Sequence, residues 1–190
     1  MVNVQLGALL DACAEDPSAA CARDAAIIAL GYACGLRRAE LVALDLDSCD
    51  RTTRTLTIHG KRRRIRAVPL EAGVDEALED WLAVRGDAAG PLFVRIQRGG
   101  HLGSERLTDQ AVYHIQATRV ATAGVVRFSP HDLRRTFAGD LLDAGVDLAT
   151  VQSLMGYSNA NTTARCNRRG ERAKRDGVKL LHVPHRKGER

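Results

Sequence analysis

The sequence predicts an α+β fold that is mainly helical and contains one small antiparallel sheet. Apolar residues recur at the spacing of amphipathic helices, as they do from Ile27 to Ala33. Two short alternating segments, 54–60 and 65–70, flank a glycine and a basic stretch, which is the pattern of a β-hairpin. No repeat or low-complexity linker interrupts the 190 residues. We therefore expect a single domain over residues 1–190.

The first half of the chain predicts three helices followed by the hairpin. The helices are expected at 3–16, 19–34 and 37–44, and Gly35 is the expected stop of the second. In the hairpin, Gly60 supplies the turn and residues 61–64 form a basic tip. Pro69 belongs at the edge or end of the second strand, because proline donates no backbone hydrogen bond.

The second half of the chain predicts further helices. Residues 71–85 read as helix, 91–96 as a third strand or extended chain, and 98–105 as a loop. A helix over 107–123 has Thr108 as its N-cap. The next helix, 129–145, starts with Ser129 as N-cap, Pro130 in the first turn and Asp132 three residues after the cap. A helix over 147–156 ends at a glycine, and two more are expected at 160–169 and 171–181.

The cysteines and the apolar runs limit the class of protein. The number of cysteines is odd and no pair has CxxC spacing, so disulfide frameworks and structural zinc sites are poor interpretations. We expect most of them to be small buried apolar residues in a reducing cytoplasm. No run of 18 apolar residues predicts a membrane span, and the N-terminus lacks the basic region of a signal peptide. The cysteines are Cys13, Cys21, Cys34, Cys49 and Cys166.

Positive charge is concentrated after residue 50. Residues 1–50 hold three basic and eight acidic residues, whereas the remaining 140 hold 25 basic and 15 acidic ones. Much of the excess lies at 61–66 and 165–175. Basic clusters of this kind favour a polyanion partner, usually nucleic acid, although a solvated basic face without a partner fits the composition equally well.

Five residues form a candidate site for phosphodiester chemistry. Arg37 and Glu40 share a helix face, Lys61 lies at the hairpin tip, and His131 and Arg134 lie on the first turns of a capped helix. Two arginines can clamp phosphate oxygens, a lysine can protonate a leaving oxygen, and a histidine can exchange protons with a nucleophile. Taken singly, an Arg-x-x-Glu pair is more often a structural salt bridge and a lone histidine is usually not catalytic. No carboxylate cluster is present to hold Mg²⁺, so we expect a metal-free mechanism without cofactors.

The motifs around these residues resemble the catalytic domain of the tyrosine recombinases, the phage integrase family. The resemblance runs from about residue 20 to 184, with ACGLRRAELVAL, HGKRRRIRAVPL, HDLRRTFA and LMGYSNANTTARCNRRG in family order. It implies an integrase-type catalytic domain. It further implies that Arg37 and Arg134 bind the scissile phosphate, that Lys61 is a general acid, and that His131 supports proton transfer. Glu40 matches the acidic residue that the family has three positions after its first arginine.

Two positions depart from the family pattern. Tyr157 stands where the family usually has His or Trp, but its hydroxyl can still donate a hydrogen bond. Cys166 stands at the position of the nucleophilic tyrosine. Neighbouring arginines would lower a thiol pKa, yet the sulfur falls short of a tyrosine oxygen by roughly 4 Å on standard bond lengths. Loss of the usual cleavage chemistry is the favoured interpretation, ahead of a nucleophile from another group and of a working thiol.

The resemblance sets the expected function. It is site-specific DNA recombination or integration by metal-free cleavage and rejoining through a covalent protein–DNA intermediate, impaired by Cys166. The alternative is a catalytically inactive DNA-binding module on the same scaffold, and an unrelated basic helical domain is the least favoured option. Double-stranded DNA is the expected partner, with self-association on DNA, no membrane contact, and a cytoplasmic location at the nucleoid when bound. The expected DNA contacts are Arg62, Arg63, Arg64, Arg66, Arg168 and Arg169.

A separate DNA-clasping domain is expected to be absent. Family members usually carry such a core-binding domain before the catalytic domain, but only about 36 residues precede Arg37. We therefore expect weak and strongly salt-dependent DNA affinity.

Overall fold

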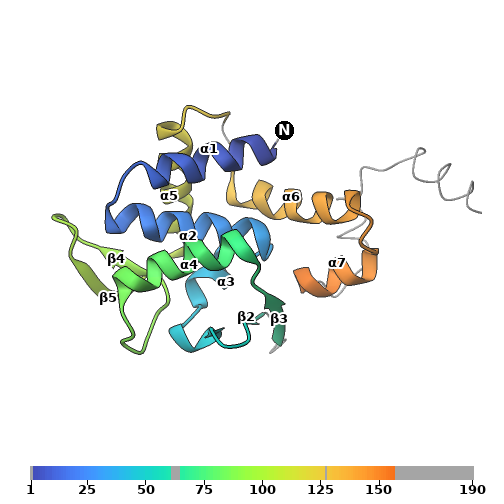
Figure 1. The fold of residues 1–190 in the computed structure, drawn as a ribbon, viewed down its shortest axis with the longest axis horizontal. Coiled ribbons are helices and arrows are strands. Elements are labelled where there is room, and N and C mark those ends of the chain that lie inside the picture. The colour runs from blue at the N-terminus through green and yellow to red at the C-terminus, as the bar shows by residue number, and fades with distance from the viewer. Residues whose placement is uncertain (1, 61–64, 127, 157–190) are drawn as a thin grey trace, which may run out of the picture.

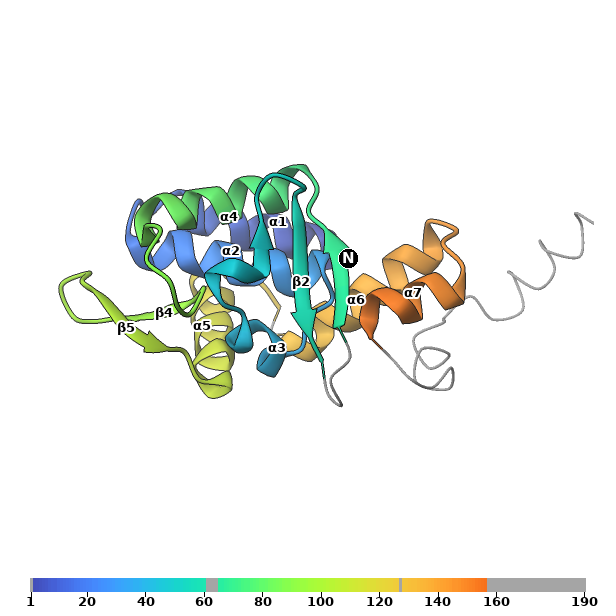
Figure 2. The ribbon, with the colours of Figure 1, turned by 90° about the horizontal axis from the view of Figure 1, so that it is seen from below.

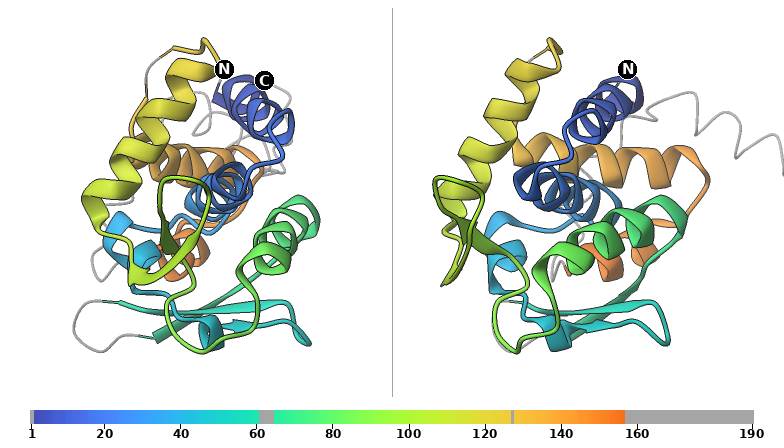
Figure 3. Two further views of the ribbon diagram at one scale, coloured as in Figure 1. Left: turned by 90° about the vertical axis from the view of Figure 1, so that its left-hand side faces the viewer. Right: turned by 60° about the vertical axis from the view of Figure 1, so that its left-hand side comes forward.

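A computed structural model of the chain describes residues 2–60, 65–126 and 128–156, and it shows helices packed around one central helix, α2 (Ala19–Ala33) (Figure 1). α2 contacts α1, α3, α4, α5 and α6. Figure 3, in which α2 is seen nearly end-on, shows these neighbours distributed around it. Small residues such as Ala26, Ala29 and Gly31 are buried on α2 and let the other helices approach closely.

The helices and strands follow the predicted order. In the described residues they are α1 (Val2–Ala14), α2, α3 (Arg38–Ala43), a 3₁₀ turn η1 (Leu46–Ser48), β1 (Cys49–Asp50), β2 (Thr55–His59), β3 (Ile65–Pro69), α4 (Ala72–Arg85), β4 (Val94–Ile96), β5 (Leu102–Arg106), α5 (Asp109–Thr122), α6 (Pro130–Asp143) and α7 (Leu148–Met155). The α+β, mainly helical class is confirmed. The helices expected at 160–169 and 171–181 lie outside the described residues.

The predicted hairpin is present and is extended by a further strand. β2 and β3 pair antiparallel from Thr55↔Pro69 to His59↔Ile65, and β1 adds to the outer side of β2. Figure 2 shows α3 next to β2 and α7 next to β3. The hairpin therefore contacts both α3, whose first turn carries candidate site residues, and α7.

The sequence interpretation of 98–105 as a loop is wrong, because this segment contains most of β5. β5 pairs with β4 in a second, two-stranded sheet, so the single sheet that we expected is also wrong. Gly99 and Gly100 turn the chain between the strands with φ of +88° and +83°. Apart from Gly103, β5 is exposed, and its sequence has no alternation of apolar and polar residues that would predict a strand. Its position depends instead on long-range bonds, including those from Arg106 to the carbonyls of Val42 and Leu44.

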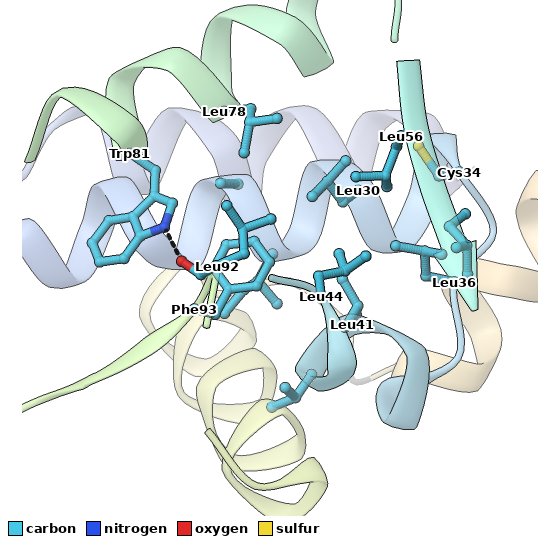
Figure 4. Packing of buried hydrophobic residues seen from close by; sticks show 14 of the residues in the cluster. Leu30, Cys34, Leu36, Leu41, Leu44, Leu56, Leu78, Trp81, Leu92 and Phe93 are labelled. Carbon is cyan, nitrogen blue, oxygen red and sulfur yellow. Dashed lines mark hydrogen bonds between the residues drawn. The ribbon is translucent and has the colours of Figure 1, made fainter. Parts of the chain in front are cut away.

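The main apolar core lies between α2, α4 and the β1–β2–β3 sheet. Trp81 is its largest side chain and is fully buried, and its indole N–H donates to the carbonyl of Leu92 at 2.9 Å (Figure 4). Phe93 stacks on Trp81 with the ring centroids 6.3 Å apart. Leu30 and Leu41 bring α2 and α3 into the same cluster, so α3 is fixed against the central helix.

The predicted helix caps are present. Thr108 accepts a hydrogen bond from the backbone N–H of Ala111. Ser129 donates from its backbone N–H and from its hydroxyl to the carboxylate of Asp132 at the start of α6. Gly156 ends α7 in the left-handed conformation, with φ +62°. These caps fix where the helices that carry the candidate site begin and end.

The described cysteines carry no disulfide. Cys13, Cys21 and Cys34 are buried and Cys49 is half-buried. Burial raises the pKa of the Cys34 thiol to about 12. No helix in the described ranges is both long enough and apolar enough to cross a membrane.

Candidate active site

Glu40 organises the first turn of α3. Its carboxylate accepts from the backbone N–H of Arg37, the N-cap residue, at 2.9 Å and from the Arg37 guanidinium at 2.7 Å. The contact predicted from their spacing is therefore present. Glu40 thus holds the Arg37 side chain at the helix start and also satisfies one of the N–H groups that a helix start leaves without a partner.

A second arginine reaches the same carboxylate from β3. Nη1 and Nη2 of Arg66 donate to the two oxygens of Glu40 at 3.0 and 2.9 Å. The two side chains are only 10% and 6% exposed. Burial by itself raises the pKa of Glu40, but the bonds from Arg66 and Arg37 outweigh it and lower that pKa to about 2.

Arg134 enters the same cluster from α6. Its Nη1 lies 3.7 Å from Glu40 Oε2, and the side chain is 3% exposed. Nη1 also donates to the carbonyl of Gly35, and Nη2 donates to the carbonyl of Met155 at 2.6 Å. Arg134 therefore connects α6 to the turn before α3 and to the end of α7.

Two glycines make these approaches possible. Gly35 has φ +55°, and a Cβ on it would lie 2.5 Å from the Phe137 ring of α6. Gly156 has φ +62°, and a Cβ on it would lie 2.9 Å from Nη1 of Arg66. A residue with a side chain is strained at either φ and would also displace a neighbour, so the cluster depends on glycine at both positions.

The cluster carries a surplus of positive charge. Arg37, Arg66 and Arg134 surround one carboxylate, which gives a net charge of +2. Arg37 is 40% exposed, whereas Arg134 is held inside. We call Glu40 and these three arginines the Glu40 cluster. An anion can approach it at Arg37, and a phosphate group suits an arginine fork.

The structure brings only some of the predicted site residues together. Arg37, Glu40 and Arg134 come together, and His131 is exposed in the first turn of α6. Arg66, which we expected at the DNA backbone, is instead bound to Glu40. The alternation of residues along β3 could have predicted that Arg66 faces inward, because Arg66 lies on the same face of the strand as buried Val68. The predicted residues outside the described part of the chain are Lys61, Arg62, Arg63, Arg64, Tyr157, Cys166, Arg168 and Arg169.

A second buried group of charges was not predicted from the sequence. Asp24 of α2 accepts from Arg23 at 2.7 Å and from Arg119 of α5 at 2.8 Å. All three side chains are at least 88% buried. We call these residues the Asp24 cluster. No group of three or more His, Cys, Asp or Glu side chains suited to holding a metal ion occurs within the described ranges.

Comparison with known proteins agrees with the fold and with the family that the motifs indicate. The model of the phage integrase family matches residues 1–171. The chain is 41% identical over 162 residues to tyrosine recombinase XerC of Azotobacter vinelandii, covering 82% of this chain and 50% of that protein. It is 37% identical over 164 residues to XerC of Corynebacterium efficiens, covering 85% and 51%. The chain thus spans about half the length of the curated relatives it matches.

A solved structure supports the same fold. The XerH site-specific recombinase bound to its difH substrate, in a pre-cleavage complex, matches with a TM-score of 0.74 at 24% identity. The match covers 94% of this chain and 53% of that chain. The resemblance deduced from the motifs is therefore confirmed, and the chain belongs to the phage integrase family.

Proposed function

We propose that this chain is a DNA strand-transfer domain of a site-specific recombinase whose cleavage step is impaired by Cys166. The observation that carries the proposal is the Glu40 cluster, in which three arginines from α3, β3 and α6 meet around a single carboxylate. A surplus of two positive charges, with Arg37 exposed at its edge, suits a phosphodiester whose negative charge grows in the transition state.

The proposed roles follow from the chemistry of each group. Arg37 and Arg134 bind and polarise the scissile phosphate. Glu40 holds the Arg37 guanidinium in place, and two backbone carbonyls hold that of Arg134. Lys61 gives a proton to the DNA oxygen that leaves phosphorus, and His131 exchanges a proton with the nucleophile. Tyr157 donates a hydrogen bond to a phosphate oxygen. The nucleophile forms a bond to phosphorus, the bond to the leaving oxygen breaks, and rejoining reverses these steps.

Cys166 is the reason for expecting impairment. A sulfur at this position stands roughly 4 Å short of a tyrosine oxygen, and a misplacement of about 1 Å already lowers rates on the order of a hundredfold. This same residue favours a second candidate function. On that alternative, the chain is a catalytically inactive module that occupies DNA sites or pairs with active subunits.

Double-stranded DNA is the proposed partner under both functions. The arginines at 62–64, 168 and 169 supply backbone contacts, and binding weakens steeply with salt because phosphate contacts release counterions. We further propose that copies associate on DNA. The cysteine pattern suits a reducing compartment, so we assign the protein to the cytoplasm and to the nucleoid when it is bound.

The test compares the chain as it stands with Cys166→Tyr and Cys166→Ala on supercoiled plasmid at low salt. The readouts are plasmid relaxation and a protein–DNA adduct that survives SDS. We expect only the tyrosine form to relax the plasmid and form the adduct. This result would mean that the remaining site residues support cleavage and that the chain lacks only the nucleophile of a strand-transfer domain.

The other outcomes decide against parts of the proposal. An adduct formed by the cysteine form and lost in Cys166→Ala would overturn the claim of impairment, because the thiol would then be a working nucleophile. DNA binding without reaction by any form, tyrosine included, would favour the binding module. A chain that does not bind DNA at low salt would overturn both candidate functions.

A further inference from the structure

We propose that Arg66 is a positioning residue that fixes Glu40 and, through it, the phosphate-binding Arg37. The inference rests on the proposed function, because it assigns to Arg66 a part in binding the scissile phosphate without touching it. It also replaces the DNA contact that we expected of Arg66 from the basic run at 61–66.

The contact with Glu40 is geometrically specific. Both terminal nitrogens of Arg66 donate to both oxygens of the carboxylate, at 3.0 and 2.9 Å. A planar guanidinium fork makes this two-point contact, whereas a lysine ammonium cannot. The carboxylate is thereby held in one orientation, and the same two oxygens receive the backbone and side chain of Arg37. Arg66 thus sets the position of Arg37 through a shared acceptor.

Arg66 also connects three parts of the chain. It lies on β3, five residues after Lys61, and its partner across the hairpin is buried Ile58. Its guanidinium lies against Gly156 at the end of α7, where Arg134 binds the neighbouring carbonyl of Met155. One side chain of β3 therefore contacts both Glu40, which binds Arg37, and the end of α7, which binds Arg134.

The structure tolerates an unfavourable group to keep Arg66 in this position. Nε of Arg66 is buried and, within the described residues, has no hydrogen-bond acceptor. Buried donors without partners are rare in folded proteins. The two-point contact with Glu40 favours a positioning role over a backbone contact.

The test measures binding of inorganic phosphate to the whole chain by NMR titration, monitored at the arginine Nε–H signals. The variants are Arg66→Ala, Arg66→Lys, Glu40→Gln and the double variant Arg66→Ala/Glu40→Gln. Arg37→Ala reports on the phosphate site itself. Arg98→Ala removes the same charge from an exposed turn between β4 and β5 and is the matched control. Melting curves establish that each variant is folded.

We expect Arg66→Ala to weaken phosphate binding about tenfold and Arg98→Ala to leave it within about twofold. Arg66→Lys keeps the charge but loses the fork, so we expect a loss of about threefold or more. In the Glu40→Gln background the Arg66→Ala change should have little further effect, because the residue acts through Glu40.

Three results would overturn the inference. The first is a phosphate affinity of Arg66→Ala equal to that of Arg98→Ala. The second is a loss of phosphate affinity on Arg66→Ala that is equally large in the Glu40→Gln background. If Arg66→Ala does not fold, an unchanged affinity in Arg66→Lys overturns it. Failure of the proposed function looks different, because Arg37→Ala itself would then leave phosphate binding unchanged.

Discussion

Within the residues that the structure describes, Asp24 and Glu40 are buried carboxylates that each bind two or more arginines, and the two clusters differ in charge and exposure. The Asp24 cluster lies between α2 and α5 and pairs one carboxylate with two arginines that are at most 12% exposed. The Glu40 cluster lies where α3, β3, α6 and the end of α7 meet. It pairs one carboxylate with three arginines, of which Arg37 is 40% exposed.

We infer that this difference separates a structural charge cluster from the proposed phosphate-binding one. The Asp24 cluster is enclosed, and Arg23 also donates to the backbone carbonyl of Val94, so its charges serve packing between elements. The Glu40 cluster keeps a larger positive surplus and exposes part of it, which is what an anion-binding site requires. Burial and ion pairing alone do not mark a site, since both clusters have them.

The largest effect that tests the comparison is on folding stability. Asp24→Asn leaves Arg23 and Arg119 buried without a carboxylate, and we expect it to lower the free energy of unfolding by about 3–5 kcal/mol. Urea unfolding measures this change, with exposed Asp11→Asn on α1 as the control. Phosphate affinity of the folded protein should not change. A loss of phosphate affinity in folded Asp24→Asn would break the distinction between the two clusters.

Unlike Asp24→Asn, Arg37→Ala should change stability little and activity strongly. Because the side chain is partly exposed, we expect a stability loss below about 1 kcal/mol. In the Cys166→Tyr form, the rate of plasmid relaxation should fall about 10²–10³-fold, since a donor to the developing charge is removed. Arg51→Ala is the matched control, because Arg51 is 54% exposed and also pairs with a glutamate, Glu79. Equal rates for the two variants would refute a phosphate-binding role for Arg37.

The loss of folding stability at low pH should depend on Glu40. The pKa of Glu40 is about 2 in the fold, against an ordinary value of 4.5. The stabilisation is therefore complete above pH about 5 and is lost as the pH falls toward 2, by on the order of 3 kcal/mol. Urea unfolding between pH 7 and 2.5 should show the stability difference between the native chain and Glu40→Gln shrinking below pH about 4.5. A difference that stays constant across this range would contradict the lowered pKa.

The sequence was informative where the site depends on neighbours along the chain. The Arg37–Glu40 contact follows from helix spacing, and the start of α6 follows from Ser129 and Asp132. The burial of Arg134 could not be predicted in this way, because its acceptors are carbonyls 99 and 21 residues away. The position of β5 likewise depends on tertiary contacts of Arg106 rather than on its own residue pattern.

The smallest predicted effect isolates the contact between Arg66 and the end of α7. Gly156 and Gly124 share φ +62°, but only at Gly156 would a Cβ meet a neighbour, Nη1 of Arg66 at 2.9 Å. Gly124→Ala should therefore lower the free energy of unfolding by about 1 kcal/mol, from backbone strain alone. Gly156→Ala should cost about 1 kcal/mol more, because Arg66 is bound to Glu40 and cannot move aside freely. Thermal unfolding of both variants gives the difference, and Arg66→Ala in the Gly156→Ala background should remove it. Equal losses of stability in Gly124→Ala and Gly156→Ala would mean that the Arg66 side chain moves aside at little cost. The contact between Arg66 and Glu40 would then be less rigid than we infer.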